Sequence, residues 1–456
     1  MAAKQDMGTD SIGKLMLRLT VPAVVAQLVN LLYSIVDRIY IGHIPDVGGT
    51  ALTGMGLCSA ILMLISAFAM LAGSGCVPLA AIAMGQENRQ QAERIMGNCF
   101  SALLICAAVL TVGFYTAAPW LLRLFGASDS TLPYALTYGR IYILGSVFVL
   151  IVLGLNAFIS TQGFAKNSML TTIIGAALNI VLDPILIFGF DMGVAGAALA
   201  TVISQTVSAI WVLLFLTGKK TILRLRLMKL EPKVIMPCLG LGFSSFVTMA
   251  TESLLAISFT ANLSRYGGDM AVGAMTILTS TNQLLTSPVS GISQGSQPII
   301  SFNFGAGNRE RVKKAFRIQF LICTVYSMAF WTVLMLFPGV FTGMFTSDAE
   351  LASYASWALR IFLAGAFSFS VQISCQQSFR ALGQAKISLF LACLRKLILL
   401  IPLIYIMPAM MEDKVFAIFL AEPISDILAA AAIALCFFLR FNKILEKGPK
   451  PVGDGT

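Results

Sequence analysis

Long apolar runs dominate this chain, and only short polar segments separate them. A helix that crosses the hydrocarbon core of a bilayer needs about 20 consecutive, mostly apolar residues. Twelve runs reach that length and leave little chain for a soluble domain. The pattern therefore predicts an all-helical (all-α) integral membrane protein. The predicted spans are 18–42, 51–82, 95–118, 140–160, 168–190, 193–216, 234–263, 271–302, 316–338, 357–380, 387–409 and 414–439.

The composition agrees with this interpretation, because 57% of the 456 residues are apolar and only 11% are charged. The first apolar run, from Leu15 onward, is too long for the core of a cleavable signal peptide, so we expect the first helix to be retained. The nine cysteines lie in or beside the spans without a C-x-x-C pair, which indicates neither a disulfide framework nor a zinc site.

The formal net charge of +10 could indicate a nucleic-acid partner, but the positions of the basic residues argue against one. Most Lys and Arg fall on the side of the two termini, which includes the linker 217–233, and we expect that linker to be a solvated loop. This asymmetry follows the positive-inside rule and predicts that both termini are cytoplasmic. The opposite side carries only Arg123, Arg140, Arg265, Arg360 and Lys414.

The two halves of the chain repeat each other at an offset of 220 residues. The segment GSGCVPLAAIAMGQENR at 73–89 aligns with SQGSQPIISFNFGAGNR at 293–309, and the same offset pairs Gly145 with Gly365. An internal duplication of six helices predicts two parallel-repeat bundles, related by a pseudo-twofold axis along the membrane normal and separated by a central cleft. This architecture favours a transporter, although channels, receptors and membrane enzymes also have many spans.

The repeat divides the chain into four expected parts. We expect the protein to be a monomer, although no sequence feature tests the oligomeric state. The parts are an N-terminal six-helix lobe at 1–216, a basic cytoplasmic linker at 217–233, a C-terminal six-helix lobe at 234–440 and a cytoplasmic tail at 441–456.

Ionisable residues inside the spans are informative, because a carboxylate at the bilayer centre costs about 2.5–3.5 kcal/mol on insertion scales. Asp183 lies in the apolar stretch LNIVLDPILIFGF at 178–190, and Asp37 lies on the first helix. At about 1.5 Å per residue from the inner ends of their helices, the two acids fall at a similar depth in the outer half of the membrane. We therefore expect them to be neighbours.

Polar groups accompany both acids. Tyr33 stands four residues before Asp37, and Asn179 stands four residues before Asp183, so each pair shares one helical face. Pro184 removes an amide hydrogen from the helix beside Asp183. A backbone carbonyl of the preceding turn can then be left free for a cation or a water molecule.

This polar cluster has no counterpart in the second half, where the residues aligned with Asp37, Asn179 and Asp183 are Ile257, Leu399 and Leu403. We predict that the three polar residues form an ion-coupling site for a proton or a small cation such as Na⁺. The alternative is that they only hold helices together through buried hydrogen bonds. A symmetric scaffold would need such contacts in both halves, and the second half has apolar residues there.

The second half carries other buried charges. Glu252 on the seventh helix could face the cleft and attract a cationic substrate, with interhelical hydrogen bonding as the alternative. Glu422 and Asp426 lie four residues apart on the last helix. We expect them to balance Arg395 and Lys396 on the eleventh helix, in a structural role.

Several segments carry a family resemblance. The motif VDRIYIG on the first helix, LNIVLDPILIFGFDMGVAGAALATVISQ on the fifth and sixth, the repeated GxxxP and GN segments and the GQAK element resemble the multidrug and toxic compound extrusion (MATE) transporters. The resemblance spans nearly the whole chain. The basic linker and the EPISD motif of the twelfth helix resemble most the MepA-type bacterial branch.

The resemblance implies antiport, in which a proton or a sodium ion enters while an organic cation leaves. Glu252 matches an acidic position that some members carry on the seventh helix. The stretch 357–380 contains no acid, so a C-terminal sodium site of the NorM type is not expected. The ion-coupling positions implied are Asp37, Asn179 and Asp183, with further polar positions at Tyr33, Tyr138, Asn156 and Thr201.

We therefore expect a multidrug efflux antiporter of the bacterial cytoplasmic membrane that exports amphiphilic cationic drugs in exchange for H⁺ or Na⁺, with no other cofactor. The sequence does not choose between the two ions. The main alternative is a flippase for lipid-linked saccharides, which would present Arg or Lys to the cleft, whereas only Arg395 and Lys396 lie deep. An enzyme is not expected, because the chain has one His and neither an H-E-x-x-H nor a G-x-S-x-G motif.

Overall fold

A computed structural model describes residues 7–45, 48–346 and 348–449, and these residues form helices without a strand. The helices are α1 (Ile12–Gly42), α2 (Gly48–Gly85), α3 (Arg89–Leu124), α4 (Leu132–Leu144), α5 (Ser146–Thr161), α6 (Ala165–Pro184), η1 (Ile185–Gly189), α7 (Gly193–Thr217), α8 (Pro232–Gly305), α9 (Arg309–Leu336), α10 (Pro338–Thr342), α11 (Ala349–Phe362), η2 (Ala366–Ser368), α12 (Phe369–Ala381), α13 (Ala385–Cys393), η3 (Leu394–Leu400), α14 (Ile401–Met410) and α15 (Lys414–Lys447).

The number of spans matches the expectation from the apolar pattern. In the described part of the chain, nine helices are long and apolar enough to cross a membrane, and two bent helix pairs raise the number to eleven. Helix α8 counts once in that number, although its 74 residues contain Gly268 with non-helical dihedral angles (φ 64°, ψ −161°). Since the chain reverses there, α8 supplies two spans and the described residues hold the predicted twelve.

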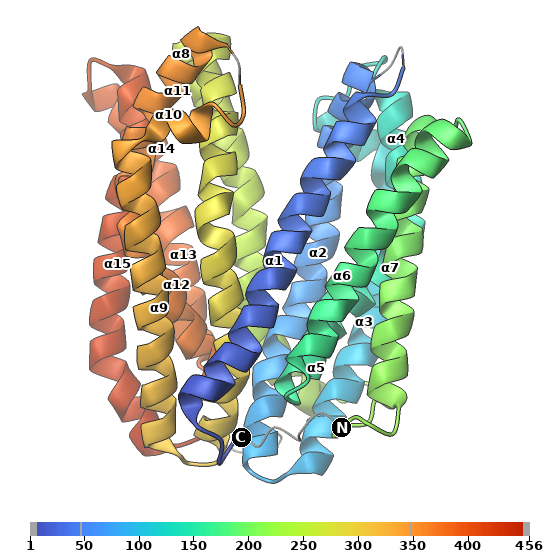
Figure 1. Cartoon of the computed structure of the whole chain (residues 1–456), viewed down its shortest axis with the longest axis vertical. Coiled ribbons are helices and arrows are strands. Elements are labelled where there is room, and N and C mark those ends of the chain that lie inside the picture. The colour runs from blue at the N-terminus through green and yellow to red at the C-terminus, as the bar shows by residue number, and fades with distance from the viewer. Residues whose placement is uncertain (1–6, 46–47, 347, 450–456) are drawn as a thin grey trace.

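The helices form two bundles, with α1 to α7 in the N-terminal lobe and α8 to α15 in the C-terminal lobe (Figure 1). The lobes meet at the end of the molecule where α1 begins and α15 ends, which we term the base. They diverge toward the opposite end (Figure 1). The fold therefore has the expected arrangement of two six-span lobes facing each other.

Helix contacts at the base follow the pseudo-twofold symmetry that the repeat predicts. A Cβ atom on Gly85 of α2 would clash with the backbone oxygen of Phe302 on α8, and a Cβ atom on Gly305 of α8 would clash with that of Ile82 on α2. The offset of 220 residues exchanges these two contacts. Small residues allow helix backbones to approach this closely in membranes. The base is thus closed by backbone-to-backbone packing of the two lobes.

Two predicted spans, 140–160 and 357–380, are bent instead of straight. The α4–α5 pair bends by 54° beside Gly145, and the α11–α12 pair bends by 48° in the region of Gly365. Each glycine packs against a neighbouring helix, and a Cβ atom on Gly365 would lie 3.0 Å from the Cα atom of Pro423. The bends let each span follow its neighbour closely, and they occur at aligned positions of the two halves.

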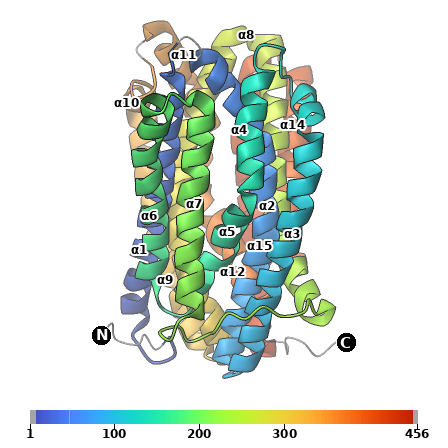
Figure 2. The same ribbon diagram turned by 90° about the vertical axis from the view of Figure 1, so that its right-hand side faces the viewer.

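The linker between the lobes is packed against the N-terminal lobe instead of being the solvated loop expected from its charge. Figure 2 shows the segment after α7 crossing the base of this lobe. Leu223 is buried, and its backbone N–H donates to Oε1 of Gln162 at 2.7 Å. Glu231 forms an ion pair with Arg94 of α3. The linker backbone is held to the lobe by its hydrogen bonds and buried leucines. Its lysines and arginines do not prevent this, because their long side chains can extend from the attached backbone into solvent.

The C-terminal helix α15 continues to Lys447, so the first part of the predicted tail 441–456 is helical. Residues 450–456 of that tail and residues 1–6 lie outside the described residues.

Candidate functional site

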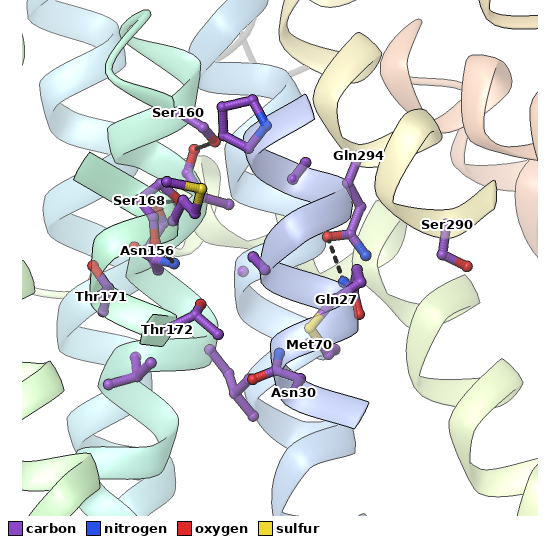
Figure 3. A pocket seen from close by; sticks show the side chains of 18 of the residues that line it. Gln27, Asn30, Met70, Asn156, Ser160, Ser168, Thr171, Thr172, Ser290 and Gln294 are labelled. Carbon is purple, nitrogen blue, oxygen red and sulfur yellow. Dashed lines mark hydrogen bonds between the residues drawn. The ribbon is translucent and has the colours of Figure 1, made fainter. Parts of the chain in front are cut away.

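A cavity of about 550 Å³ lies between the two lobes, where the repeat predicted a central cleft. Side chains of α1, α2, α4, α5, α6 and α7 line it from the N-terminal lobe, and side chains of α8 and α12 line it from the C-terminal lobe. Figure 3 shows polar groups of α1 facing polar groups of α5 and α6 across this space. The labelled side chains include Gln27, Asn30, Asn156, Ser168, Thr171, Thr172 and Gln294.

Helix α1 brings a row of polar residues to the cavity. Gln27, Asn30 and Tyr33 line the wall. They are spaced three residues apart, and Asp37 follows four residues later, so all lie near one helical face. Asp37 itself is 5% exposed and is not a lining residue, because it sits behind the wall. The amide of Gln27 also reaches the other lobe, since its Nε2 donates to Oε1 of Gln294 at 3.1 Å (Figure 3).

The two acids predicted to be neighbours lie together. The side chains of Asp37 and Asp183 interact with each other, and Asp183 is fully buried. Nδ2 of Asn179 donates to Oδ1 of Asp183 at 3.3 Å and lies 3.3 Å from Oγ1 of Thr201.

Three buried oxygens of this cluster accept no hydrogen bond from the described residues. They are Oδ1 of Asp37, Oδ1 of Asn179 and Oδ2 of Asp183. Leaving a buried acceptor unsatisfied costs about 1–3 kcal/mol, and more for a charged group. A proton or a small cation would satisfy such oxygens. No group of three or more His, Cys, Asp or Glu side chains is placed to hold a metal among the described residues, so a sodium ion here would also need amide or hydroxyl oxygens.

The polar residues that the family resemblance added fall into two groups. Tyr33 and Thr201 line the cavity beside the acid pair, and Tyr138 is not a lining residue and is buried, with 2% of its surface exposed. Asn156 also lines the cavity, but its Nδ2 donates to the backbone oxygen of Ser168 at 3.1 Å. Asn156 therefore joins α5 to α6, while the other three surround the carboxyl groups.

The backbone beside Asp183 departs from a regular helix, as the proline predicts. Helix α6 ends at Pro184, and the π-helical turn η1 follows directly over Ile185–Gly189. Proline has no amide hydrogen to donate, so the regular hydrogen-bond ladder cannot continue through it. Single π-turns inside membrane helices are frequent at functional sites.

Glu252 forms an ion pair with Lys396, and 48% of its side chain stays exposed. It is not among the residues that line this cavity, so its role at the cleft stays a prediction. The expected pairing of Glu422 and Asp426 is confirmed for Arg395, whose Nη2 lies 3.0 Å from Oε1 of Glu422 and whose Nε lies 2.6 Å from Oδ1 of Asp426. These charges form a compensated cluster inside the C-terminal lobe.

Four lining residues of the C-terminal lobe were not singled out from the sequence. Three of them are glutamines, and the sequence did contain a pattern that could have identified these, because polar residues recur at three-residue spacing within apolar spans. Arg380 gave no such signal, since it stands at the end of its span among other flanking basic residues. The four residues are Gln294, Gln297, Gln377 and Arg380.

Comparison with known proteins gives a consistent result. A family model described as MatE matches residues 22–185 and 244–406, once in each half. Multidrug export protein MepA of Staphylococcus saprophyticus is 23% identical over 441 residues, covering 96% of both chains. Multidrug export protein MepA of Staphylococcus aureus is 23% identical over 436 residues, covering 94% of both chains.

The fold is also shared with solved structures. One, described as the outward-facing conformation of a multidrug resistance MATE family transporter of the MOP superfamily, superposes with a TM-score of 0.90 at 23% identity. The superposition covers 98% of this chain and 99% of that chain.

Proposed function

Because this chain belongs to the MatE family, we propose that it is a multidrug efflux antiporter, which exports amphiphilic organic cations in exchange for H⁺ or Na⁺. The observation that carries the proposal is the acid pair of Asp37 and Asp183, buried beside a cavity between the two lobes. Each acid has one carboxyl oxygen that accepts no hydrogen bond from the described residues. Unsatisfied buried oxygens and buried acids are energetically costly, and binding of a cation to them would reduce that cost.

The coupling ion binds at Asp37, Asn179 and Asp183. Asn179 lines the cavity together with Tyr33 and Thr201, and an ion can reach the two carboxyl groups between these polar side chains. Ion binding neutralises the carboxyl groups, and this weakens the attraction between the N-terminal lobe and a positively charged substrate. Substrate and ion therefore compete for the same negative charge.

The cycle follows from that competition. In the conformation described, the base is closed, and the positive-inside rule assigns the base to the cytoplasmic side. The ion enters from outside and the substrate leaves. Closure of the outer end and opening of the base then release the ion to the cytoplasm and admit the next substrate. A ligand can drive this change only through different affinities for the two states.

The protein acts in this proposal as a monomer in the bacterial cytoplasmic membrane, since one chain supplies both walls of the cavity. The substrate-attracting role predicted for Glu252 would require its ion pair with Lys396 to open. The flippase alternative calls for basic residues facing the cavity, and the described lining residues offer Arg380 alone.

The proposal is tested by efflux of ethidium from vesicles under an imposed pH gradient or sodium gradient, measured separately. Asp37→Asn and Asp183→Asn should each lower the gradient-driven rate at least about tenfold, because a lost charge-assisted interaction is worth about 1.5–3 kcal/mol. The gradient that drives wild-type efflux identifies the ion.

Asp191→Asn is the matched control, because Asp191 is exposed in the turn that follows η1 and its positive φ of 54° suits asparagine. This variant should transport as the wild type does. Undiminished gradient-driven efflux by both Asp37→Asn and Asp183→Asn would remove the coupling role of the pair.

A further inference from the structure

The cavity contains a single charged lining residue among those the structure describes, and that residue is basic. Arg380 stands near the end of α12 and contributes to the wall formed by the C-terminal lobe. The acids of the N-terminal lobe lie behind the opposite wall. A positively charged wall is unexpected in a cavity whose only substrates are organic cations.

The guanidinium of Arg380 is incompletely paired. Its Nη1 donates to Oγ of Ser245 at 2.7 Å, whereas its Nε is buried and has no hydrogen-bond partner in the described part of the chain. None of the ion pairs formed by the described residues includes it. An enclosed cation without an acid is costly, and an anion that enters the cavity would remove much of that cost.

The position of Arg380 along the chain does not account for this arrangement. Basic residues at the cytoplasmic ends of membrane helices follow the positive-inside rule and extend toward lipid headgroups. Arg380 instead points between the lobes, where it donates to Ser245 of α8 and lines the cavity. A basic residue whose only role is to fix the orientation of the helix in the membrane would not need to line an enclosed cavity.

Flexible amide groups surround the arginine. Gln377, one turn earlier on α12, donates from its Nε2 to Oε1 of Gln297 at 3.0 Å, and both side chains line the cavity. In the first half the residues aligned with Gln377 and Arg380 are Ala157 and Ser160. Among the described residues, the basic group of the wall therefore belongs to the C-terminal lobe, opposite the acid pair of the N-terminal lobe.

We propose that Arg380 is an anion subsite, which binds one carboxylate or phosphate group of the transported molecule. The guanidinium fork suits the two oxygens of such a group. Resting on the proposed function, this makes the favoured substrates zwitterions, with the cationic end toward Asp37 and Asp183 and the acidic end at Arg380. The two lobes would then each hold one end of the substrate.

A matched pair of dyes tests the subsite. Rhodamine 110 carries a free carboxylate, and rhodamine 123 is its methyl ester, so the two differ in this group alone. Binding to the purified full-length protein is measured by fluorescence polarisation without any ion gradient. Arg380→Gln should weaken rhodamine 110 binding about tenfold and leave rhodamine 123 binding unchanged, as expected for one charge-assisted hydrogen-bonded contact.

Two further variants make the result decisive. Arg360→Gln is the matched control, because Arg360 is exposed on the adjoining helix α11 and should not affect either dye. Arg380→Lys keeps the charge without the planar fork, and it should give an intermediate loss for rhodamine 110. If Arg380→Gln does not fold, this lysine variant decides in its place. Equal losses for both dyes, or no loss for either, would overturn the proposal.

The anion could also come from a membrane lipid instead of a substrate. Competition with phosphatidic acid in the same detergent separates the two sources. Binding of this lipid that depends on Arg380, with no difference between the dyes, would contradict the proposal. Because binding is measured without a gradient, the subsite can fail while Asp183→Asn still abolishes coupled efflux, and the reverse can also occur.

Discussion

Single residues show that the two lobes treat buried charge in opposite ways. In the C-terminal lobe Arg395 bonds both Glu422 and Asp426, so the acids are compensated within the protein. In the N-terminal lobe neither Asp37 nor Asp183 belongs to an ion pair among the described residues. A compensated cluster stabilises a fold, whereas an uncompensated one leaves room for an ion to bind and leave.

Removal of the compensating cation should therefore affect stability more than chemistry. Arg395→Met leaves Glu422 and Asp426 buried without a partner, and breaking a buried pair in this way costs about 3–5 kcal/mol. We expect a clearly lower melting temperature of the purified protein in detergent. Arg395→Lys, which keeps one charge, should lose less. A melting temperature of Arg395→Met equal to that of the wild type would contradict the structural role of the cluster.

The same residues show what the sequence could reveal about the site. An acid followed by proline inside an apolar run is conspicuous, so Asp183 could be selected and paired with Asp37 by depth. Arg380 is inconspicuous, because basic residues at the end of a span are ordinary. The pairing of Glu252 with Lys396 was equally hidden, since it depends on which faces of two distant helices meet.

At the scale of elements, the crossing of α2 with the end of α8 closes the base. The close approach depends on Gly85 and Gly305, whose missing side chains let one helix touch the backbone of the other. This contact exists in the conformation described and has to separate in the proposed cycle. The proposal therefore makes the crossing both a stabilising contact and a part of the moving interface.

A larger side chain at this crossing should disfavour the closed base. Gly85→Val forces a Cβ atom into the backbone of Phe302, and overpacking of this kind costs about 1–3 kcal/mol. We expect reduced thermal stability and reduced efflux. Gly56→Val is the control on the same helix, because a Cβ atom at Gly56 meets nothing within 4 Å. Equal thermal stability and equal efflux of the two variants would show that the close α2–α8 contact is not needed for either property.

Elements were predictable in number but not in shape. The apolar runs gave the spans and the break at Gly268 between the seventh and eighth, yet the bend beside Gly145 was not visible in them. The reason is that hydropathy reports which residues avoid water and contains no information on the neighbour against which a helix bends.

For the whole molecule, the proposed cycle requires the lobes to separate at the base. Cys76 of α2 and Cys238 of α8 provide a native reporter, because both are buried in one core cluster and the backbone of Cys238 packs against Gly75, the neighbour of Cys76. Cross-linking them with a thiol oxidant should stop efflux, and a reductant should restore it. The experiment belongs in a Cys99→Ser background, since Cys99 is buried in the same core cluster as Cys76.

Cys238→Ser should make efflux insensitive to the oxidant, which controls for damage elsewhere. The cross-link itself is verified by mass spectrometry of proteolysed protein. Continued efflux by fully cross-linked protein would mean that the lobes do not part near Cys76, and the rocking motion would have to be replaced by a more local change.

The sequence by itself determined the class of molecule, the twelve spans, the twofold repeat and the asymmetric acid cluster. Each of these follows from local hydrophobicity or from comparison of the chain with itself, and both can be read without knowing how the helices pack. Only the tertiary structure decided that the base is closed, that the linker packs on α3, that Glu252 is paired and that Arg380 enters the cavity. Those outcomes depend on which helix faces meet. The packing of side chains that are far apart in the sequence determines which faces these are.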